Sequence, residues 1–190
     1  MIIQPYLHKV ICSSCGALIT LPIDIVQTNV LSNTSYIFKP NEFKYMFLMI
    51  NVFSIQNYIF DIINYINNNA IKGFICGFTI SPIVIYLKIK KYYLRFNSYP
   101  IYKNFIFIYT LREMLFYSIL YSLYYSNIPY IKLYASLLTN IFIFPIKIIA
   151  LKYSYLFLVI NKNSIIKSSF IEILKSAIGD SIALNLINMK

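Results

Sequence analysis

Charged residues are scarce in this chain of 190 residues, and acidic residues are the scarcest. Asp, Glu, Lys and Arg make up 12% of the sequence, with 6 acidic against 17 basic side chains. Because a soluble domain carries about 25% charged residues, a water-soluble fold explains this composition poorly. The formal net charge of +11 could suit nucleic acid, but that partner needs a solvated basic face, which few sequences this apolar have. We therefore expect no nucleic-acid partner.

Cysteine and histidine are also few, which restricts the chemistry available to the chain. Cys12, Cys15 and Cys76 do not form a disulfide framework. Cys12 and Cys15 have the spacing of a metal or redox pair, with His8 four residues earlier. No second cysteine pair or histidine cluster accompanies them, so small residues at a helix contact are the favoured interpretation. We expect no metal site and no cofactor.

The sequence also shows no paired catalytic carboxylates, no nucleophile elbow and no phosphate-binding loop. These patterns are the usual signs of hydrolytic, acyl-transfer or phosphoryl-transfer sites. We therefore predict no catalytic residues and no enzyme activity.

What the chain has in abundance is apolar sequence, at 59% hydrophobic residues. The stretch 104–159 contains two apolar segments that meet at a short break, residues 126–129. Each segment has about 20 residues, enough to cross a hydrocarbon core of about 30 Å at about 1.5 Å per residue. The break is long enough only for an antiparallel return. This stretch therefore predicts a membrane-embedded helical hairpin.

The remaining sequence predicts two more spans and two short amphipathic helices, which together make one all-α membrane domain over residues 1–190 with about four transmembrane helices. The predicted segments are a first span at 6–30, an amphipathic helix and glycine junction at 57–77, a second span at 78–96, the hairpin at 104–159, and an amphipathic helix and tail at 165–190. Three prolines inside apolar segments predict helix kinks, namely Pro22, Pro82 and Pro145.

Ionisable side chains inside apolar segments are candidate functional groups, because charge at membrane depth is costly. Arg112 and Glu113 lie near the middle of the first half of the hairpin and should face protein or a water-filled cavity. Adjacent residues point about 100° apart on a helix, so each of the two could instead pair with a different neighbouring helix. Both interpretations stay open at this stage.

The order of these motifs resembles one repeat of the mitochondrial carrier family. The quoted matches are Pro22-Ile-Asp24-Ile-Val-Gln27 for the odd-helix motif, Gly73-Phe-Ile-Cys-Gly77 for the glycine junction, Thr110-Leu-Arg112-Glu113 for an even helix, and Pro145-Ile-Lys147 for the next odd helix. The resemblance implies six tilted helices around a central cavity, alternating access, and the mitochondrial inner membrane. It also implies that Arg112 and Glu113 contact the substrate.

The chain departs from the family's pattern at several positions. Gln27 stands where the family has a basic residue, Lys147 stands where it has an acid, and fewer than six helices are visible. The resemblance implies that Asp24, Gln27 and Lys147 are gate or structural charges, and Asp24 could bridge to Lys147 if their helices are neighbours. The short link at 97–103 requires the helix after it to run antiparallel to 78–96, whereas the even-helix likeness requires the opposite direction.

Two functions remain compatible with these observations. The first is a carrier-derived protein that no longer transports and serves as an accessory subunit of a larger membrane complex. The second is a carrier that moves a small anionic metabolite. The expected partners are lipids, including anionic lipids, other membrane subunits, and a small anionic solute.

Overall fold

The computed structural model describes residues 3–32, 48, 52, 55–56, 58–96, 103–128, 130–154 and 162–188. Over these residues the fold is all-helical. Its named helices are α1 (Ile3–Ser32), α3 (Asn69–Phe96), α4 (Lys103–Tyr124), α5 (Ile131–Phe142), α6 (Phe144–Ser154) and α7 (Lys162–Asn188). The link predicted at 97–103, apart from Lys103, and the last residues of the hairpin, 155–159, lie outside the described residues.

Helix α3 starts earlier than the sequence predicts. The predicted amphipathic helix appears at residues 58–62, and a turn follows at 63–65. The side chain of Asn68 then caps α3 by accepting hydrogen bonds from the backbone N–H groups of Ala70 and Ile71, at 2.9 and 3.2 Å. This cap satisfies donors that a helix start leaves unpaired. The glycines expected in a junction therefore lie inside α3.

Proline affects the helices in two different ways. Pro82 lies inside α3, where it leaves the carbonyl of Phe78 without its usual donor. The hydroxyl of Ser81 donates to that carbonyl at 2.9 Å, which compensates for the loss. Pro145 is the second residue of α6 and follows the break between α5 and α6, a position where its missing N–H costs little. The second half of the hairpin is thus two helices rather than one.

Helix α5 runs antiparallel to α4, and the C-terminal segment is longer than expected. Residues 125–128 and Tyr130 lead from α4 into α5, and Tyr130 has a left-handed backbone at φ 62°. The 165–190 segment was expected to be a short amphipathic helix and a tail. It is instead part of α7, a single helix of 27 residues, because its apolar and small residues let it pack along α1 and α5.

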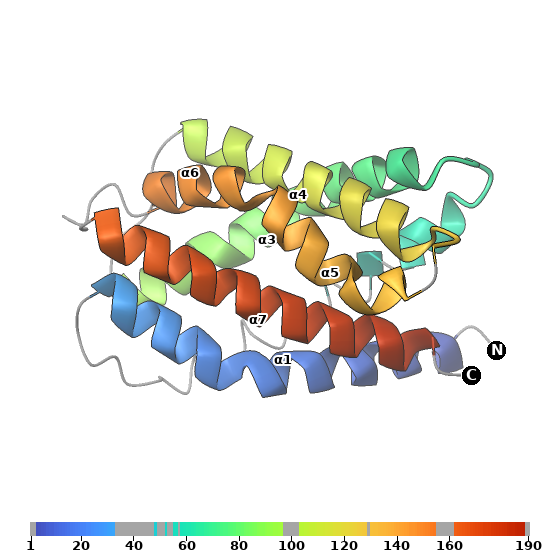
Figure 1. Cartoon of the computed structure of the whole chain (residues 1–190), viewed down its shortest axis with the longest axis horizontal. Coiled ribbons are helices and arrows are strands. Elements are labelled where there is room, and N and C mark those ends of the chain that lie inside the picture. Colours follow the sequence, from blue (N-terminus) through green and yellow to red (C-terminus); the bar gives the residue numbers. More distant parts are fainter. Residues whose placement is uncertain are drawn as a thin grey trace.

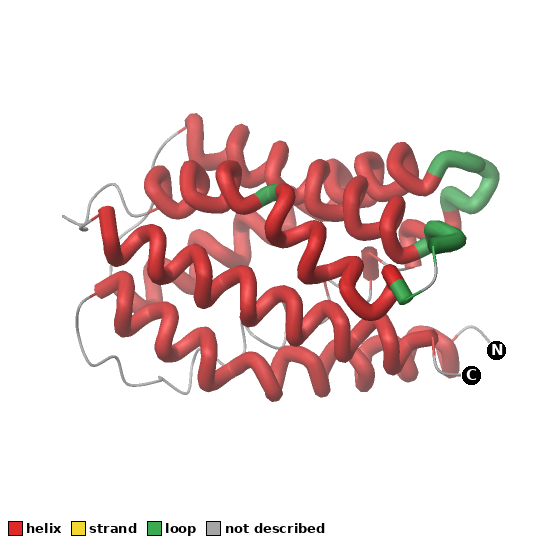
Figure 2. Tube along the Cα trace, in the orientation of Figure 1, coloured by secondary structure: helices red, strands yellow, loops and turns green. Residues whose placement is uncertain are grey.

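Successive helices of the bundle run antiparallel to their neighbours, in the order α3, α4, α5–α6, α7 and α1 (Figures 1 and 2). Gly73 lies beside Tyr117 and Gly77 beside Glu113, which makes α3 and α4 antiparallel. This settles the direction that the sequence left open. Both chain termini lie at one end of the bundle, here the terminal end (Figure 1). The other end, where α1, α3 and α6 finish and α4 and α7 begin, is here the distal end.

Two apolar clusters flank Arg112 and Glu113 on α4, and the polar groups around this pair are here called the polar layer. The larger cluster joins α3, α4 and α5 through residues such as Ile80, Leu120 and Ala135. The smaller cluster lies toward the distal end and includes Phe105 and Ala150. In the described part of the chain, three helices are long and apolar enough to cross a membrane, over Val10–Gln27, Asn69–Lys91 and Asn104–Tyr124. A membrane-embedded all-α protein is therefore the class that the structure supports.

Candidate functional site: a buried charge network

Arg112 lies at the centre of a network of buried charges inside the bundle. It is only 9% exposed. Its Nη1 atom is 2.7 Å from Oε1 of Glu113, and its Nη2 atom is 2.8 Å from Oε1 of Glu172 on α7. The planar guanidinium suits this geometry because its donors point in fixed, separate directions. Arg112 therefore links α4 to α7 and also binds its own neighbour in sequence.

Glu113 extends the network from α4 to α3. Its Oε1 atom lies 3.8 Å from Nζ of Lys88. The ammonium of Lys88 is 4.3 Å from the centre of the Tyr109 ring, and the guanidinium carbon of Arg112 is 5.7 Å from the same centre. An aromatic face attracts cations that have been removed from water. The ring of Tyr109 thus lies close to both cations and favours their burial.

Asp24 forms a second centre, where three helices meet. Its carboxylate accepts hydrogen bonds from Nζ of Lys91 on α3, at 2.8 and 2.6 Å, and from Nζ of Lys175 on α7, at 2.6 Å. Asp24 is 5% exposed. The backbones of α1 and α3 do not pack against each other. The Asp24–Lys91 pair is therefore a side-chain bridge across a wider separation than at the packed helix pairs.

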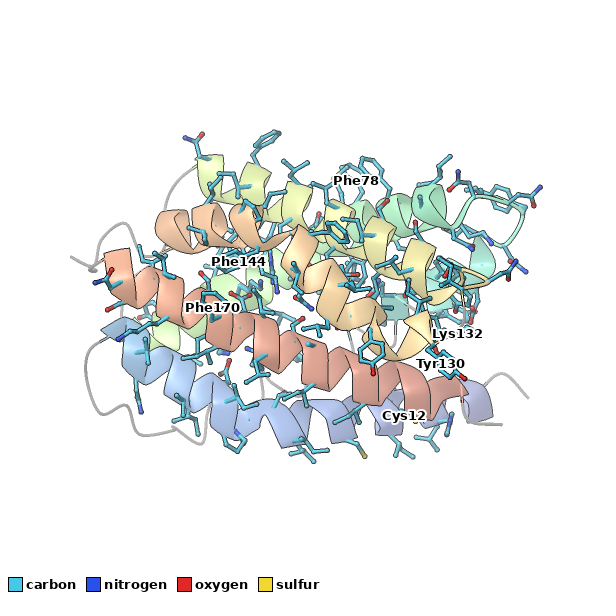
Figure 3. The ribbon with its side chains drawn as sticks, viewed as in Figure 1. Cys12, Phe78, Tyr130, Lys132, Phe144 and Phe170 are labelled. Carbon is cyan, nitrogen blue, oxygen red and sulfur yellow. The ribbon has the colours of Figure 1, made fainter. Side chains whose placement is uncertain are left out.

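Lys147 is fully buried on α6, close to the α5–α6 break. Its ammonium donates a hydrogen bond to the side-chain oxygen of Asn140 on α5 and lies 5.9 Å from the centre of the Phe116 ring. The amide of Asn140 in turn donates to the carbonyl of Ser136 at 2.7 Å. These contacts fix the angle between α5 and α6. Beside them, the rings of Phe144 and Phe170 join α6 to α7, with centroids 5.1 Å apart (Figure 3).

The network holds more positive than negative groups. Its five cations are Lys88, Lys91, Arg112, Lys147 and Lys175, and its three carboxylates are Asp24, Glu113 and Glu172. At low dielectric such charges interact much more strongly than in water. The polar layer is therefore a region of positive potential inside an apolar bundle.

Glu172 lies outside the three candidate spans, and its titration reflects this field. Burial by itself raises the pKa of the Glu172 carboxyl. Arg112, followed by Lys147, Lys88 and Lys175, outweighs burial and holds the pKa at about 2. The carboxylate is therefore ionised at neutral pH, as its pairing with Arg112 requires.

The structure brings most of the predicted charges into this layer, where Asp24 pairs with two lysines that the sequence did not single out. The described partners of Asp24 are Lys91 and Lys175, and α1 packs on α7 rather than on α6, which carries Lys147. The Asp24–Lys147 bridge stays a prediction, which a double-mutant cycle tests. Gln27 is buried and donates to the carbonyl of Ser168 at 3.5 Å.

The predicted glycines lie at a helix contact, and the prolines lie at the surface. A Cβ atom at Gly73 would come within 2.2 Å of the Tyr117 carbonyl oxygen, and one at Gly77 within 2.6 Å of the Glu113 carbonyl oxygen. These two residues therefore bring α3 and α4 into direct backbone contact. Pro22 and Pro82 are exposed inside continuous helices.

Sequence reasoning missed four of the network's members: Lys88, Lys91, Glu172 and Lys175. A usable signal was present in the sequence. Lys88 and Lys91 are three residues apart on α3, and Glu172 and Lys175 are three residues apart on α7. Residues three apart share a helix face. An ionisable pair on one face of an apolar helix indicates a buried partner, although spacing cannot say which helix supplies it.

Cys12 and Cys15 do not form a metal centre with the described residues. The Sγ atom of Cys12 is 3.6 Å from Nε2 of His8, whereas Cys15 is exposed. Within the described part of the chain, no group of three or more His, Cys, Asp or Glu side chains gathers in a position to hold a metal ion. Gly16, which follows Cys15 in α1, and Thr20 lie against Gly179 of α7, so small residues of α1 do form a helix contact.

Comparison with known proteins identifies no relative of this chain. No family model, no curated protein and no solved structure matches the chain. The function therefore has to be inferred from the buried charge network.

Proposed function

We propose that this chain is a carrier-derived protein of the mitochondrial inner membrane that acts as a non-transporting accessory or structural subunit of a larger membrane complex. The observation that carries the proposal is the double engagement of Arg112. Its guanidinium is held by Glu113 and by Glu172 on another helix. A group bound in this way stabilises the bundle, and a solute would have to displace one carboxylate to reach it.

The order of the sequence motifs supports the carrier-derived part of the proposal. In this proposal, α5 and α6 together form a fourth crossing of the membrane. Their 24 residues, 131–154, would extend about 36 Å at about 1.5 Å per residue, which is sufficient for a hydrocarbon core of about 30 Å. Gln27 and Lys147, which depart from the carrier pattern, make hydrogen bonds inside the bundle. Both residues then serve packing rather than a closing ring of ion pairs.

The outer surface supports an embedded subunit. Large apolar side chains are exposed on helices around the bundle, and lipid tails or a partner subunit would cover them. Examples are Ile11, Leu18, Phe78, Phe107, Ile141 and Phe142.

Purification from native membranes in a mild detergent tests the accessory role. We expect the chain to elute with partner proteins at fixed stoichiometry, and Arg112→Ala to reduce the yield of the assembled complex. A chain that elutes alone and catalyses solute exchange after reconstitution would contradict the proposal.

A second candidate function, a carrier for a small anionic metabolite, is favoured by one specific observation. The network holds five cations and three carboxylates, so an anion would be attracted to the polar layer. Exchange of phosphate, nucleotides or carboxylates in proteoliposomes tests this function. Exchange that is lost in Arg112→Ala but kept in Lys167→Gln, which alters an exposed lysine, would establish transport and overturn the accessory role.

A further inference from the structure

The two ends of the bundle differ sharply in charge. By sequence, the helix turns at the distal end carry six cationic residues besides the five named in the network, and no acidic residue. These six residues are Lys90 and Arg95 in α3, Lys103 at the start of α4, Lys152 in α6, and Lys162 and Lys167 in α7. The distal end is therefore a concentrated positive region.

The terminal end has a weaker and more balanced charge. Its helix turns carry Lys9, Lys72 and Lys132 against Asp61, and Asp180 lies further in, eight residues before the end of α7. Lys72 is also buried, donates to the side-chain oxygen of Asn64 at 3.0 Å and lies over the Phe60 ring. Beside Lys132, the exposed ring of Tyr130 marks this end (Figure 3). Tyrosines are frequent at membrane interfaces on either side, so charge rather than aromatic content distinguishes the two ends.

The buried network strengthens the same asymmetry. Arg112 is nine residues from the start of α4, Glu172 is ten from the start of α7, and Asp24 is eight from the end of α1. At about 1.5 Å per residue, these groups lie roughly 12–15 Å from the distal end. The surplus positive charge of the network therefore adds to the field of the six cations at the distal end.

We propose that the distal end rests on the anionic headgroups of one leaflet, so that the chain is oriented with this end on the electrically negative side of the membrane. Basic residues next to membrane spans are retained on that side and are attracted by anionic lipid phosphates. The terminal end, with both chain termini and the link from α4 to α5, then lies on the opposite side. This orientation follows from charge and geometry, and holds for either candidate function.

Site-specific labelling tests the orientation of the full-length chain in a bacterial inner membrane. The background is Cys15→Ser, because Cys15 is exposed whereas Cys12 and Cys76 are buried. One reporter is Asn127→Cys in the turn at the terminal end, and the other is Asn163→Cys at the distal end, both at exposed positions. A membrane-impermeant maleimide should label the first in spheroplasts and the second only in inverted vesicles. The reverse pattern, or equal labelling of both reporters in one preparation, overturns the proposal.

A second measurement tests the headgroup contact in reconstituted protein. Replacing part of the phosphatidylcholine with phosphatidylglycerol should raise the unfolding temperature by roughly 2–4 °C at low salt, and high salt should remove the gain. The triple variant Lys90→Gln, Lys162→Gln, Lys167→Gln should lose most of the gain. The matched control, Lys9→Gln with Lys132→Gln at the terminal end, should keep it. An equal loss in both variants, or no lipid dependence in the unaltered chain, overturns the headgroup contact.

Discussion

At the residue scale, Arg112 joins α4 to α7 through Glu172 and also binds Glu113, so its removal leaves Glu172 without its nearest cation. Glu113 and Glu172 lie within 2.7 and 2.8 Å of its nitrogens and are nearly inaccessible to water. Removing one partner of a buried ion pair generally costs far more than the intact pair contributes, since the remaining charge is left desolvated. The network is therefore sensitive to any single neutralisation.

The first prediction concerns Arg112 and Glu172. Arg112→Met should lower the free energy of unfolding by about 3–5 kcal/mol, because it leaves two buried carboxylates. The double variant Arg112→Met, Glu172→Leu should recover part of that loss. Thermal and denaturant unfolding in detergent micelles measure both, with Lys167→Gln as the exposed control. Losses that simply add would show that the two side chains do not interact.

The second prediction concerns Asp24 and its two lysines. Asp24→Asn should destabilise the bundle by about 2–3 kcal/mol, and Lys91→Gln or Lys175→Gln by about 1 kcal/mol each, since the lysines are partly solvated. A double-mutant cycle of Asp24 with Lys91 should show coupling, whereas one of Asp24 with Lys147 should show additive losses. Coupling between Asp24 and Lys147, without coupling between Asp24 and Lys91, would support the Asp24–Lys147 bridge predicted from sequence.

At the element scale, small residues set the distance between neighbouring helices. Gly73 and Gly77 put the α3 backbone directly against α4. Gly179 of α7 faces α1, but a Cβ atom there would meet the methyl group of Thr20 at 3.1 Å rather than backbone. A side chain can move aside by a small amount, whereas a packed helix backbone cannot. The two helix contacts should therefore tolerate alanine very differently.

The third prediction compares these glycines. Gly73→Ala and Gly77→Ala should each lower the free energy of unfolding by about 1–3 kcal/mol through overpacking. Gly179→Ala should change it by less than about 1 kcal/mol in either direction, because helix propensity offsets the tighter contact. Unfolding in micelles measures all three variants. A larger loss at Gly179 than at Gly73 would contradict the packing of α3 on α4.

At the scale of the whole molecule, the distribution of apolar surface decides where the protein resides. Large apolar side chains are exposed around the bundle while the charges of the network are enclosed, which is the reverse of a water-soluble protein. The polar layer joins α1, α3, α4 and α7 by ion pairs. The bundle therefore holds together from within while its outer face suits lipid.

The fourth prediction follows from this distribution. The chain should remain in the membrane fraction after alkaline carbonate washing and should enter solution only with detergent, because its exposed apolar side chains lie along the candidate spans. Immunoblotting of the fractions measures this, with a peripheral membrane protein as the released control. A folded, monodisperse protein in buffer without detergent would be incompatible with the membrane assignment.

The sequence by itself determined the helical class, the turn at 126–129 and the depth of Arg112 in its segment. Hydrophobic length and turn residues are local properties, so these features need no knowledge of neighbours. The extent of α7 and the start of α3 escaped prediction, because polar residues that looked like breaks are accommodated by packing and by the Asn68 cap.

The tertiary structure alone decided which charges meet. Asp24 binds Lys91 of α3 and Lys175 of α7, and Arg112 reaches Glu172 sixty residues further along the chain. Ion pairing depends on which helices are adjacent and on their directions. That order is set by the summed packing of whole helix faces, which no local pattern of residues encodes.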